Sequence, residues 1–222
     1  MSAPSVILLL GPMRSGKTAF VRRLTGKGDE GIPTSECKTY DATLSGKVYR
    51  IIDTPGFDDS PRANLSVLKD IAAELSRMNK QRLTVGGVIY FHRITDLRLT
   101  GSARINIEIF ERICGAQFLP RSVFVTSMWN MIDNLDRAKY EKLDASLRQK
   151  YGRLRSKFLK FESDKTNSAQ TVLLAAASSR AGQPPQLEAE VIRSGLSASS
   201  VRKTEAGKVI VREMNKSSCA IL

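Results

Sequence analysis

Gly11-Pro-Met-Arg-Ser-Gly-Lys17-Thr18 is the stretch that decides the fold of this chain. It has the pattern G-x-x-x-x-G-K-[ST] and directly follows the apolar run 5–10, so it lies where a first strand turns into a first helix. In such a turn the glycines allow backbone angles that a Cβ would obstruct, and successive amide N–H groups form a concave nest for phosphate oxygens. The sequence therefore predicts a nucleoside triphosphate site.

Two side chains of this loop have specific expected roles. Lys17 would span the β- and γ-phosphates, and the Thr18 hydroxyl would ligate Mg²⁺, while the N-terminus of the following helix supplies its positive dipole end. We expect nine consecutive residues to contact the nucleotide: Gly11, Pro12, Met13, Arg14, Ser15, Gly16, Lys17, Thr18 and Ala19.

The composition fits one globular domain with an appendage. The chain has 222 residues, of which 41% are hydrophobic, and a second full domain would not fit comfortably. Its cysteines form no C-x-x-C pair, so neither a disulfide framework nor a structural zinc site is indicated, and a reducing compartment is expected. The apolar stretch 6–10 is too short for a signal-peptide core, and no segment approaches a membrane span. The three cysteines are Cys37, Cys114 and Cys219.

The charge of the chain is strongly positive, with a formal value of +13. Segment 137–160 contributes more than half of this excess, because it holds nine Lys or Arg against two acidic residues. Such a segment favours polyanions, either nucleic acid or the anionic inner leaflet of a membrane.

Segments with the apolar pattern of strands alternate along the chain with segments that have helical spacing. This alternation predicts a doubly wound α/β sheet of the P-loop NTPase type. Strands are expected at 40–44, 47–53, 85–91, 122–126 and, weakly, 157–161. One helix is expected around 105–113, one along an apolar stripe from Tyr140 to Phe158, and one at 168–177. The predicted organisation is a P-loop domain at 1–177, a linker at 178–186, a helical extension at 187–217 and a short tail at 218–222.

A second motif, Asp53-Thr-Pro-Gly56, ends a predicted strand 36 residues after Lys17. In a P-loop protein, Asp53 would hold a Mg²⁺-bound water, and the Gly56 N–H would meet the γ-phosphate. Segment 57–62 then becomes a candidate switch that orders only with the triphosphate.

With both motifs present, the chain resembles the septin-like P-loop GTPases, and within them the immunity-associated (AIG-type) family and similar single-domain proteins of fungi. The likeness spans about 5–177. It also rests on Pro33-Thr34-Ser35-Glu36-Cys37 and on Phe91-His92-Arg93-Ile94-Thr95. The resemblance implies GTP and Mg²⁺ as ligands, Thr34 as the second protein ligand of the metal, and a nucleotide-dependent homodimer with the G-domains face to face. Thr39 is an alternative to Thr34.

The chain departs from this family at the position that reads the base. Guanine-specific proteins present a carboxylate after the fifth strand, but here the sequence is Thr126-Ser-Met-Trp129. Trp129 would either stack on the purine or pack in the core. Asp133 is a further candidate from the following loop. GTP is the first expectation from the resemblance, and ATP is the alternative.

A second departure concerns hydrolysis. Phe57 follows the glycine of the D-x-x-G motif, where Ras-like enzymes have the glutamine that orients water, so slow turnover is expected. Arg14 would stabilise the transition state in cis from within the P-loop. The resemblance implies that Arg93 reaches across the dimer instead. The alternative for each arginine is a solvated or ion-paired surface side chain, and His92 is expected to be structural.

The last four residues, Cys219-Ala220-Ile221-Leu222, fit the C-a-a-X motif for geranylgeranylation. A lipid together with basic residues would make membrane attachment durable. The upstream basic residues are Lys203, Lys208, Arg212 and Lys216.

These features predict a switch protein that hydrolyses GTP slowly with Mg²⁺. We expect it to be cytoplasmic and attached to the cytosolic face of a membrane by its lipid anchor. The alternatives are a nucleotide-locked scaffold that hydrolyses nothing and, third, a nucleic-acid-binding ATPase. Nucleic acid is the less expected partner, because segment 137–160 lacks an aromatic stacking platform apart from its apolar stripe.

Overall fold

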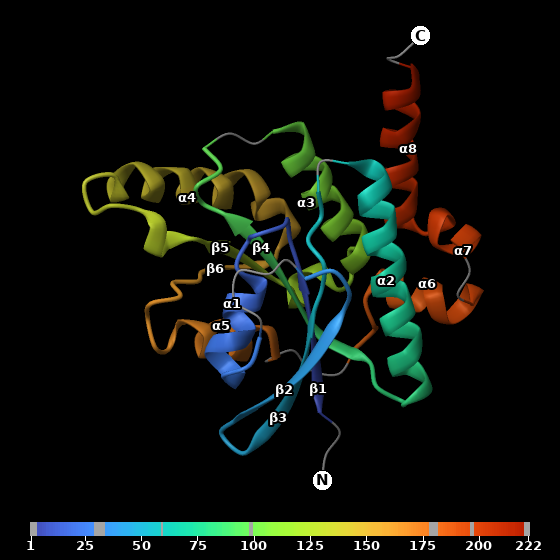
Figure 1. Ribbon diagram of the computed structural model, residues 1–222, viewed down its shortest axis with the longest axis horizontal. Helices are drawn as coiled ribbons and strands as arrows, with labels where there is room; N and C mark the ends of the chain where they lie inside the picture. Colours follow the sequence, from blue (N-terminus) through green and yellow to red (C-terminus); the bar gives the residue numbers. More distant parts are fainter. Residues whose placement is uncertain are drawn as a thin grey trace.

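A computed structural model describes residues 4–28, 34–58, 60–97, 100–177, 182–195 and 198–219. Its centre is a six-stranded sheet with the order β2-β3-β1-β4-β5-β6 (Figure 1). Only the pair β2 and β3 is antiparallel, and the other neighbours are parallel. The strands are β1 Ser5–Leu10, β2 Lys38–Leu44, β3 Lys47–Asp53, β4 Val85–Arg93, β5 Val123–Ser127 and β6 Lys157–Lys160.

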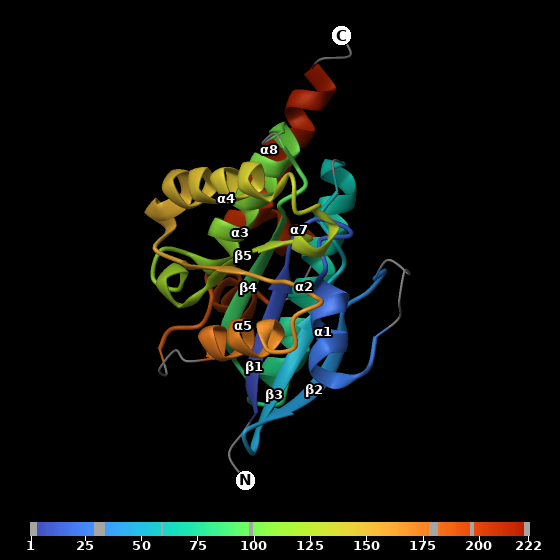
Figure 2. The same cartoon turned by 90° about the vertical axis from the view of Figure 1, so that its left-hand side faces the viewer.

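Helices cover both faces of this sheet (Figures 1 and 2). Helices α1 and α5 lie on one face, whereas α2, α3, α6 and α8 pack together on the other. The helices are α1 Lys17–Thr25, α2 Pro61–Lys80, α3 Gly101–Cys114, α4 Arg137–Tyr151, α5 Ser168–Ala177, α6 Gln186–Ser194, α7 Ala198–Lys203 and α8 Glu205–Cys219. The predicted doubly wound P-loop fold is therefore confirmed.

Strand β1 shows how the sequence specifies the two layers. Successive side chains of a strand point to opposite faces, so both faces of a central strand must be apolar. Val6, Leu8 and Leu10 belong to the core under α2 and α3. Ile7 and Leu9 belong to the core under α1 and α5. The loop that follows β1 is thus fixed at the centre of the sheet.

The predicted helical extension consists of three helices, α6, α7 and α8, and it shares the core of the G-domain. Leu187, Val191, Val201 and Ile210 are buried in the same cluster as residues of β1 and α2. The first helix begins at Gln186, one residue inside the predicted linker, and the last ends at Cys219. Residues 178–181 and 220–222 and the side chain of Cys219 lie outside the described residues.

The apolar stripe from Tyr140 to Phe158 is not one helix, which corrects the prediction. Helix α4 ends at Tyr151, and a single 3₁₀ turn, Gly152–Leu154, leads to Arg155 in the left-handed region with φ 59°. Phe158 lies on β6 and stacks on Phe124 of β5, with ring centroids 4.8 Å apart. Side chains of α4 and of β6 face the same core. The apolar residues therefore keep a helix-like spacing in the sequence beyond Tyr151, where the helix itself ends.

Among the described residues, none of the helices combines the length and apolar character needed to span a bilayer.

Glu188 is a buried carboxylate where the C-terminal helices meet the sheet. It lies on α6 with only 1% of its surface exposed. Its Oε2 accepts a hydrogen bond of 3.1 Å from the N–H of Val85, the first residue of β4. Burial raises the pKa of Glu188 to about 7, although the hydrogen bond from Val85 opposes this shift.

We predict that Glu188 makes the stability of the fold pH-dependent. Its pKa is higher in the folded than in the unfolded chain, so its contribution is fully present below about pH 4 and is lost as pH rises through about 7. Urea unfolding of the wild type should show a loss of up to about 3 kcal/mol between pH 5 and pH 8. Glu188→Gln keeps an acceptor for Val85 and should lack this loss.

Glu141→Gln is the matched control, because the Glu141 side chain is 44% exposed. This variant should keep the pH dependence of the wild type. Equal pH profiles for the wild type and Glu188→Gln would contradict the assignment.

Candidate nucleotide-binding site

The loop Gly11 to Thr18 is held tightly between the ends of three strands. Gly11 has φ 143°, and a Cβ there would lie 2.5 Å from the carbonyl oxygen of Phe91 on β4, so only glycine fits. The Ser127 hydroxyl at the end of β5 donates to the carbonyl oxygens of Ser15 (2.8 Å) and His92 (3.1 Å). Neighbouring strands therefore fix the backbone nest at its base.

Lys17 is buried above this loop with 5% of its surface exposed. Its Nζ donates to the carbonyl oxygens of Gly11 (3.3 Å) and Pro12 (3.1 Å). Burial lowers the pKa of Lys17 to about 8, while Asp53 opposes this shift and Arg93 adds to it. A phosphate would restore favourable electrostatics to this ammonium group, as expected for the lysine of a P-loop.

Three oxygen-bearing side chains converge next to Lys17. The Thr18 hydroxyl donates to Asp53 Oδ2 at 2.7 Å, and the Thr34 hydroxyl donates to the same oxygen at 3.3 Å. The two hydroxyl oxygens lie 3.1 Å apart. Within the described ranges, Asp53 Oδ1 is buried without a hydrogen-bond partner. Burial raises the pKa of Asp53, although hydrogen bonds from the two threonines and the charge of Lys17 oppose the shift.

This arrangement fits Mg²⁺, because the ion prefers hard oxygen ligands and the orphaned carboxylate oxygen would gain a partner. The structure thus brings together the three predicted metal ligands, Thr18, Thr34 and Asp53. Thr39, the alternative to Thr34, does not belong to this cluster, because its hydroxyl donates to Glu74 at 3.0 Å.

The D-x-x-G segment lies directly against the P-loop. A Cβ on Gly56 would approach the backbone nitrogen of Met13 to 2.3 Å, so the two loops pack at glycine distance. The Phe57 N–H donates to the Gly11 carbonyl, and the Met13 N–H donates to the Phe57 carbonyl, each at 3.1 Å. The Phe57 side chain is buried in the core. This segment therefore offers no side-chain hydrogen bond to a water at position 57.

The two candidate arginines differ in their surroundings. Arg14 is exposed at the tip of the P-loop with φ 54° and makes no ion pair with the described residues. Arg93 Nε donates to Asp96 at 3.0 Å, and its Nη1 donates to the Met13 carbonyl at 3.2 Å. Of the two candidate arginines, Arg93 is therefore the one that is ion-paired. Its hydrogen bond to Met13 joins it to the P-loop of its own chain.

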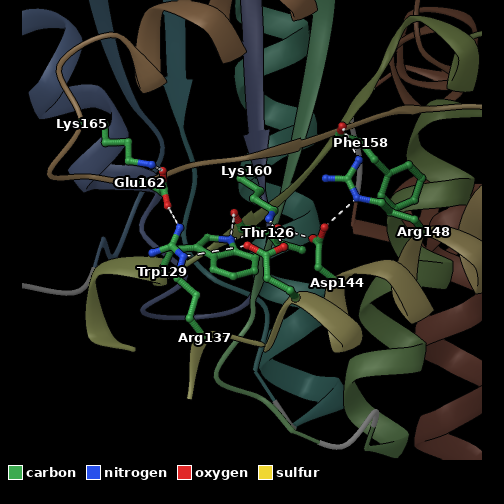
Figure 3. Close-up of polar contacts among 10 residues, drawn as sticks. Thr126, Trp129, Arg137, Asp144, Arg148, Phe158, Lys160, Glu162 and Lys165 are labelled. Carbon is green, nitrogen blue, oxygen red and sulfur yellow. Dashed lines mark hydrogen bonds and ion pairs between the residues drawn. The ribbon is translucent and has the colours of Figure 1, made fainter. Parts of the chain in front are cut away.

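Trp129 packs in the core, which is the second of the two alternatives for this residue and not the base-stacking role. Figure 3 shows its polar contacts. Trp129 is 1% exposed, and its indole N–H donates to the carbonyl oxygen (3.2 Å) and hydroxyl (3.1 Å) of Thr126. The Lys160 ammonium lies 4.3 Å and the Arg137 guanidinium 5.4 Å from the ring centroid. Cations already contact the ring, and Asp133 is exposed in the following loop.

Glu162 is a buried carboxylate that the sequence analysis did not include among the candidate site residues. It follows the end of β6, its side chain is 10% exposed, and it pairs with Arg137 and Lys165 (Figure 3). Burial raises the pKa of Glu162, but the hydrogen bonds from Lys165 and Arg137 outweigh this effect and hold the pKa below its usual value. An acidic residue directly after the last strand is the only sequence signal for this site.

The basic segment 137–160 carries less free charge than its composition indicates. With partners among the described residues, Arg and Lys side chains at four of its nine basic positions form ion pairs. One of these pairs joins Arg148 to Asp144, a buried residue whose other oxygen accepts a hydrogen bond of 2.7 Å from Thr126. The paired residues are Arg137, Arg148, Arg153 and Lys160, with Glu162, Asp144, Glu111 and Glu141 as their respective partners.

Comparison with known proteins supports the resemblance inferred from the motifs. No protein-family model matches the chain. Immune-associated nucleotide-binding protein 5 of Arabidopsis thaliana is 36% identical to it over 88 residues, which are 37% of this chain and 26% of that protein. The resemblance to the immunity-associated family is thereby confirmed. The match spans about a quarter of the length of this curated relative.

Solved structures of GTPases share the fold. Toc33 from Arabidopsis thaliana, in complex with Mg²⁺ and GMPPNP, has a TM-score of 0.58 and 17% identity, with 79% of this chain and 85% of that chain covered. Era, in complex with MgGDPNP and a fragment of 16S ribosomal RNA, has a TM-score of 0.57 and 13% identity, with 83% and 59% covered. At these identities the likeness shows the fold alone, which is that of P-loop GTPases.

Proposed function

We propose that this chain is a nucleotide-dependent switch protein that binds GTP and GDP together with Mg²⁺. The observation that carries the proposal is the cluster of Thr18, Thr34 and Asp53, with hydroxyl-to-carboxylate distances of 2.7 and 3.3 Å, beside the buried Lys17. The names of the compared proteins support it, since one is a nucleotide-binding protein and others hold Mg²⁺ with GDP or a guanine nucleotide analogue.

Two loops would sense the nucleotide through this cluster. When bound, Mg²⁺ neutralises charge on the phosphates. Thr18 at the start of α1 and Asp53 at the end of β3 would hold the metal, together with Thr34 from the segment before β2. Gly56 packs against the P-loop and offers its N–H to the γ-phosphate. Loss of that phosphate removes a partner of both loops, which is the basis of a switch.

Lys17→Ala should abolish nucleotide binding in a folded protein. Lys17 contacts the phosphates through charge-assisted hydrogen bonds of about 1.5–3 kcal/mol each, so two lost bonds should weaken binding by at least about 100-fold. Titration calorimetry with GTP and Mg²⁺ measures this. Lys27→Ala, an exposed lysine after α1, is the control and should bind normally. Normal affinity in a folded Lys17→Ala variant would remove the P-loop assignment.

Glu162 is the residue that we propose reads the base. A carboxylate can accept both the N1–H and the exocyclic amine of guanine, and Glu162 already accepts from the guanidinium of Arg137, whose N–H groups present a similar donor edge. The site lies at the carboxyl end of the sheet, where nucleotides bind in open α/β folds. A guanine would replace Arg137 at this carboxylate. The alternative is an ATP-binding protein without base discrimination.

Glu162→Gln should reduce the preference for GTP over ATP at least about tenfold, because an amide matches only one of the two guanine donors. Competition titrations with both nucleotides give the ratio. Glu141→Gln, which removes a neighbouring carboxylate paired with Lys160, is the control and should keep the ratio. An unchanged ratio in Glu162→Gln would assign base reading to another group.

Hydrolysis is proposed to be slow and to depend on Arg14. Phe57 cannot orient water, and Arg14 is exposed on the P-loop without an ion pair in the described part of the chain. Arg93 would have to leave Asp96 and Met13 to reach a second subunit. A homodimer is proposed from the family resemblance, and a dimerization-deficient mutant of Toc33 supports it by analogy.

Arg14→Ala should lower GTP turnover by about 10³-fold at every protein concentration, which is the smallest effect typical of an arginine finger. Arg93→Ala should keep most of the activity. Turnover assays over a range of concentrations distinguish the two residues. If instead Arg93→Ala is inactive and wild-type specific activity rises with concentration, the finger acts across the dimer. No turnover in the wild type would favour the nucleotide-locked scaffold.

Membrane attachment through a lipid on Cys219 is proposed for the C-terminus, on the cytosolic face of a membrane. Helix α8 extends beyond α2 and α3, so its end stands clear of the body (Figures 1 and 2). Three of the four basic residues that precede the motif form ion pairs with glutamates. Basic charge alone is therefore a weak membrane signal here, and the lipid must supply most of the affinity.

Cys219→Ser should move the protein from the membrane to the soluble fraction of a eukaryotic cell, because a serine hydroxyl is not prenylated. Fractionation, with mass spectrometry of the C-terminal peptide, measures both effects. Ser218→Ala leaves the motif intact and should behave as the wild type. An unmodified Cys219 in wild-type protein, or equal fractions for the two proteins, would end the proposal.

A further inference from the structure

Asn64 is a buried polar side chain on the first turns of α2. Only 3% of its surface is exposed, so its amide group has almost no contact with water. Burying an amide costs free energy unless its N–H groups and its carbonyl oxygen find partners within the protein. The partners of this amide therefore indicate what the Asn64 side chain does.

Both polar groups of the Asn64 amide bind the backbone of one residue, Asp58. The Asp58 N–H donates to Asn64 Oδ1 at 2.7 Å, and Asn64 Nδ2 donates to the Asp58 carbonyl oxygen at 2.9 Å. A planar amide can donate and accept at the same time, so the two bonds fix the orientation of Asp58 as well as its position. Together they form a clamp on the backbone just after the D-x-x-G motif.

The two residues before Asp58 are held by the P-loop. The Phe57 N–H donates to the Gly11 carbonyl oxygen, and the Phe57 carbonyl oxygen accepts from the Met13 N–H, each at 3.1 Å. Gly56 packs so closely on Met13 that a Cβ at position 56 would lie 2.3 Å from the Met13 nitrogen. Segment 56–58 therefore has two supports, which are the P-loop and Asn64.

Helix α2 anchors the second of these supports in the core. Leu65 and Leu68, on the same turns as Asn64, are 4% and 0% exposed. Capping of the helix does not account for Asn64, because the Ser60 side chain caps α2 by accepting from the Ala63 N–H at 3.4 Å. The Asn64 side chain thus joins segment 56–58 to the body of the protein.

We propose that Asn64 is a positioning residue for the γ-phosphate of the bound nucleotide. This inference rests on the proposed function, in which the Gly56 N–H meets the γ-phosphate. The clamp on Asp58 limits how far Gly56 can move away from the P-loop, so the N–H is in place before the triphosphate binds. A diphosphate makes no contact at Gly56. The clamp therefore favours the triphosphate over the diphosphate.

Calorimetric titration of the full chain with GMPPNP and with GDP, each together with Mg²⁺, tests this proposal. Asn64→Leu has a side chain of similar size and lacks both bonds to Asp58. It should lower the ratio of the GMPPNP affinity to the GDP affinity at least about tenfold, because a charge-assisted hydrogen bond to the γ-phosphate is weakened. The GDP affinity itself should stay close to that of the wild type.

A purely structural role of Asn64 predicts a different result, in which the protein loses stability but the ratio of affinities does not change. Thr204→Val is the matched control for this alternative. Thr204 is 4% exposed, and its hydroxyl donates to the Val201 carbonyl oxygen at 2.7 Å and accepts from the Gly207 N–H at 3.0 Å. This variant also loses two bonds to the backbone, but in the C-terminal helices. It should lower the thermal midpoint and keep the wild-type ratio.

Asn64→Asp is a second variant, which removes only one of the two bonds. A carboxylate still accepts from the Asp58 N–H but cannot donate to the Asp58 carbonyl oxygen. The ratio should fall in this variant as well. An unchanged ratio in either folded Asn64 variant would overturn the proposal and leave Asn64 a structural role. A wild type that binds neither nucleotide would instead contradict the proposed function, and this inference would fall with it.

Discussion

The site depends on one close contact, between Gly11 and the carbonyl oxygen of Phe91. A Cβ at position 11 would lie 2.5 Å from that oxygen, so the P-loop can leave β1 in this direction only as glycine. The contact sets the loop against the end of β4, and the Ser127 hydroxyl of β5 donates both to Ser15 of the loop and to His92 of β4. The buried faces of β1 fix the strand itself. The position of the phosphate nest is thus a consequence of core packing.

Asp53 links this nest to the two segments of the proposed switch. Its Oδ2 accepts hydrogen bonds from Thr18 on α1 and from Thr34 ahead of β2. Three residues later, Gly56 packs on the backbone of Met13. One carboxylate at the end of one strand therefore joins the P-loop, the Thr34 segment and the Gly56 segment. Changes at the phosphate position reach both segments through contacts already present in the fold.

Features of the site that depend on short sequence motifs could be predicted from the sequence. Features that depend on contacts between residues distant in the chain could not. The P-loop, Asp53 and the positions of the strands follow from short motifs and the spacing of apolar residues, and Thr34 came from the family resemblance. The roles of Trp129 and Glu162 did not follow, because each depends on residues far along the chain, such as Lys160 over the indole ring and Arg137 beside the carboxylate. Helix α2 also went unpredicted, although Ser60 caps it and Pro61 begins it.

The C-terminal helices determine how any anchor would relate to the nucleotide site. Leu187, Val191 and Ile210 are buried against α2 and α3, so releasing α6 to α8 would expose core residues. Arg212 of α8 also forms a two-pronged ion pair with Glu108 of α3, at 3.1 and 2.8 Å. These helices therefore do not behave as a flexible tether. A lipid at Cys219 would be joined rigidly to α3, whose first turns lie beside the P-loop, so membrane attachment would restrict the orientation of the nucleotide face.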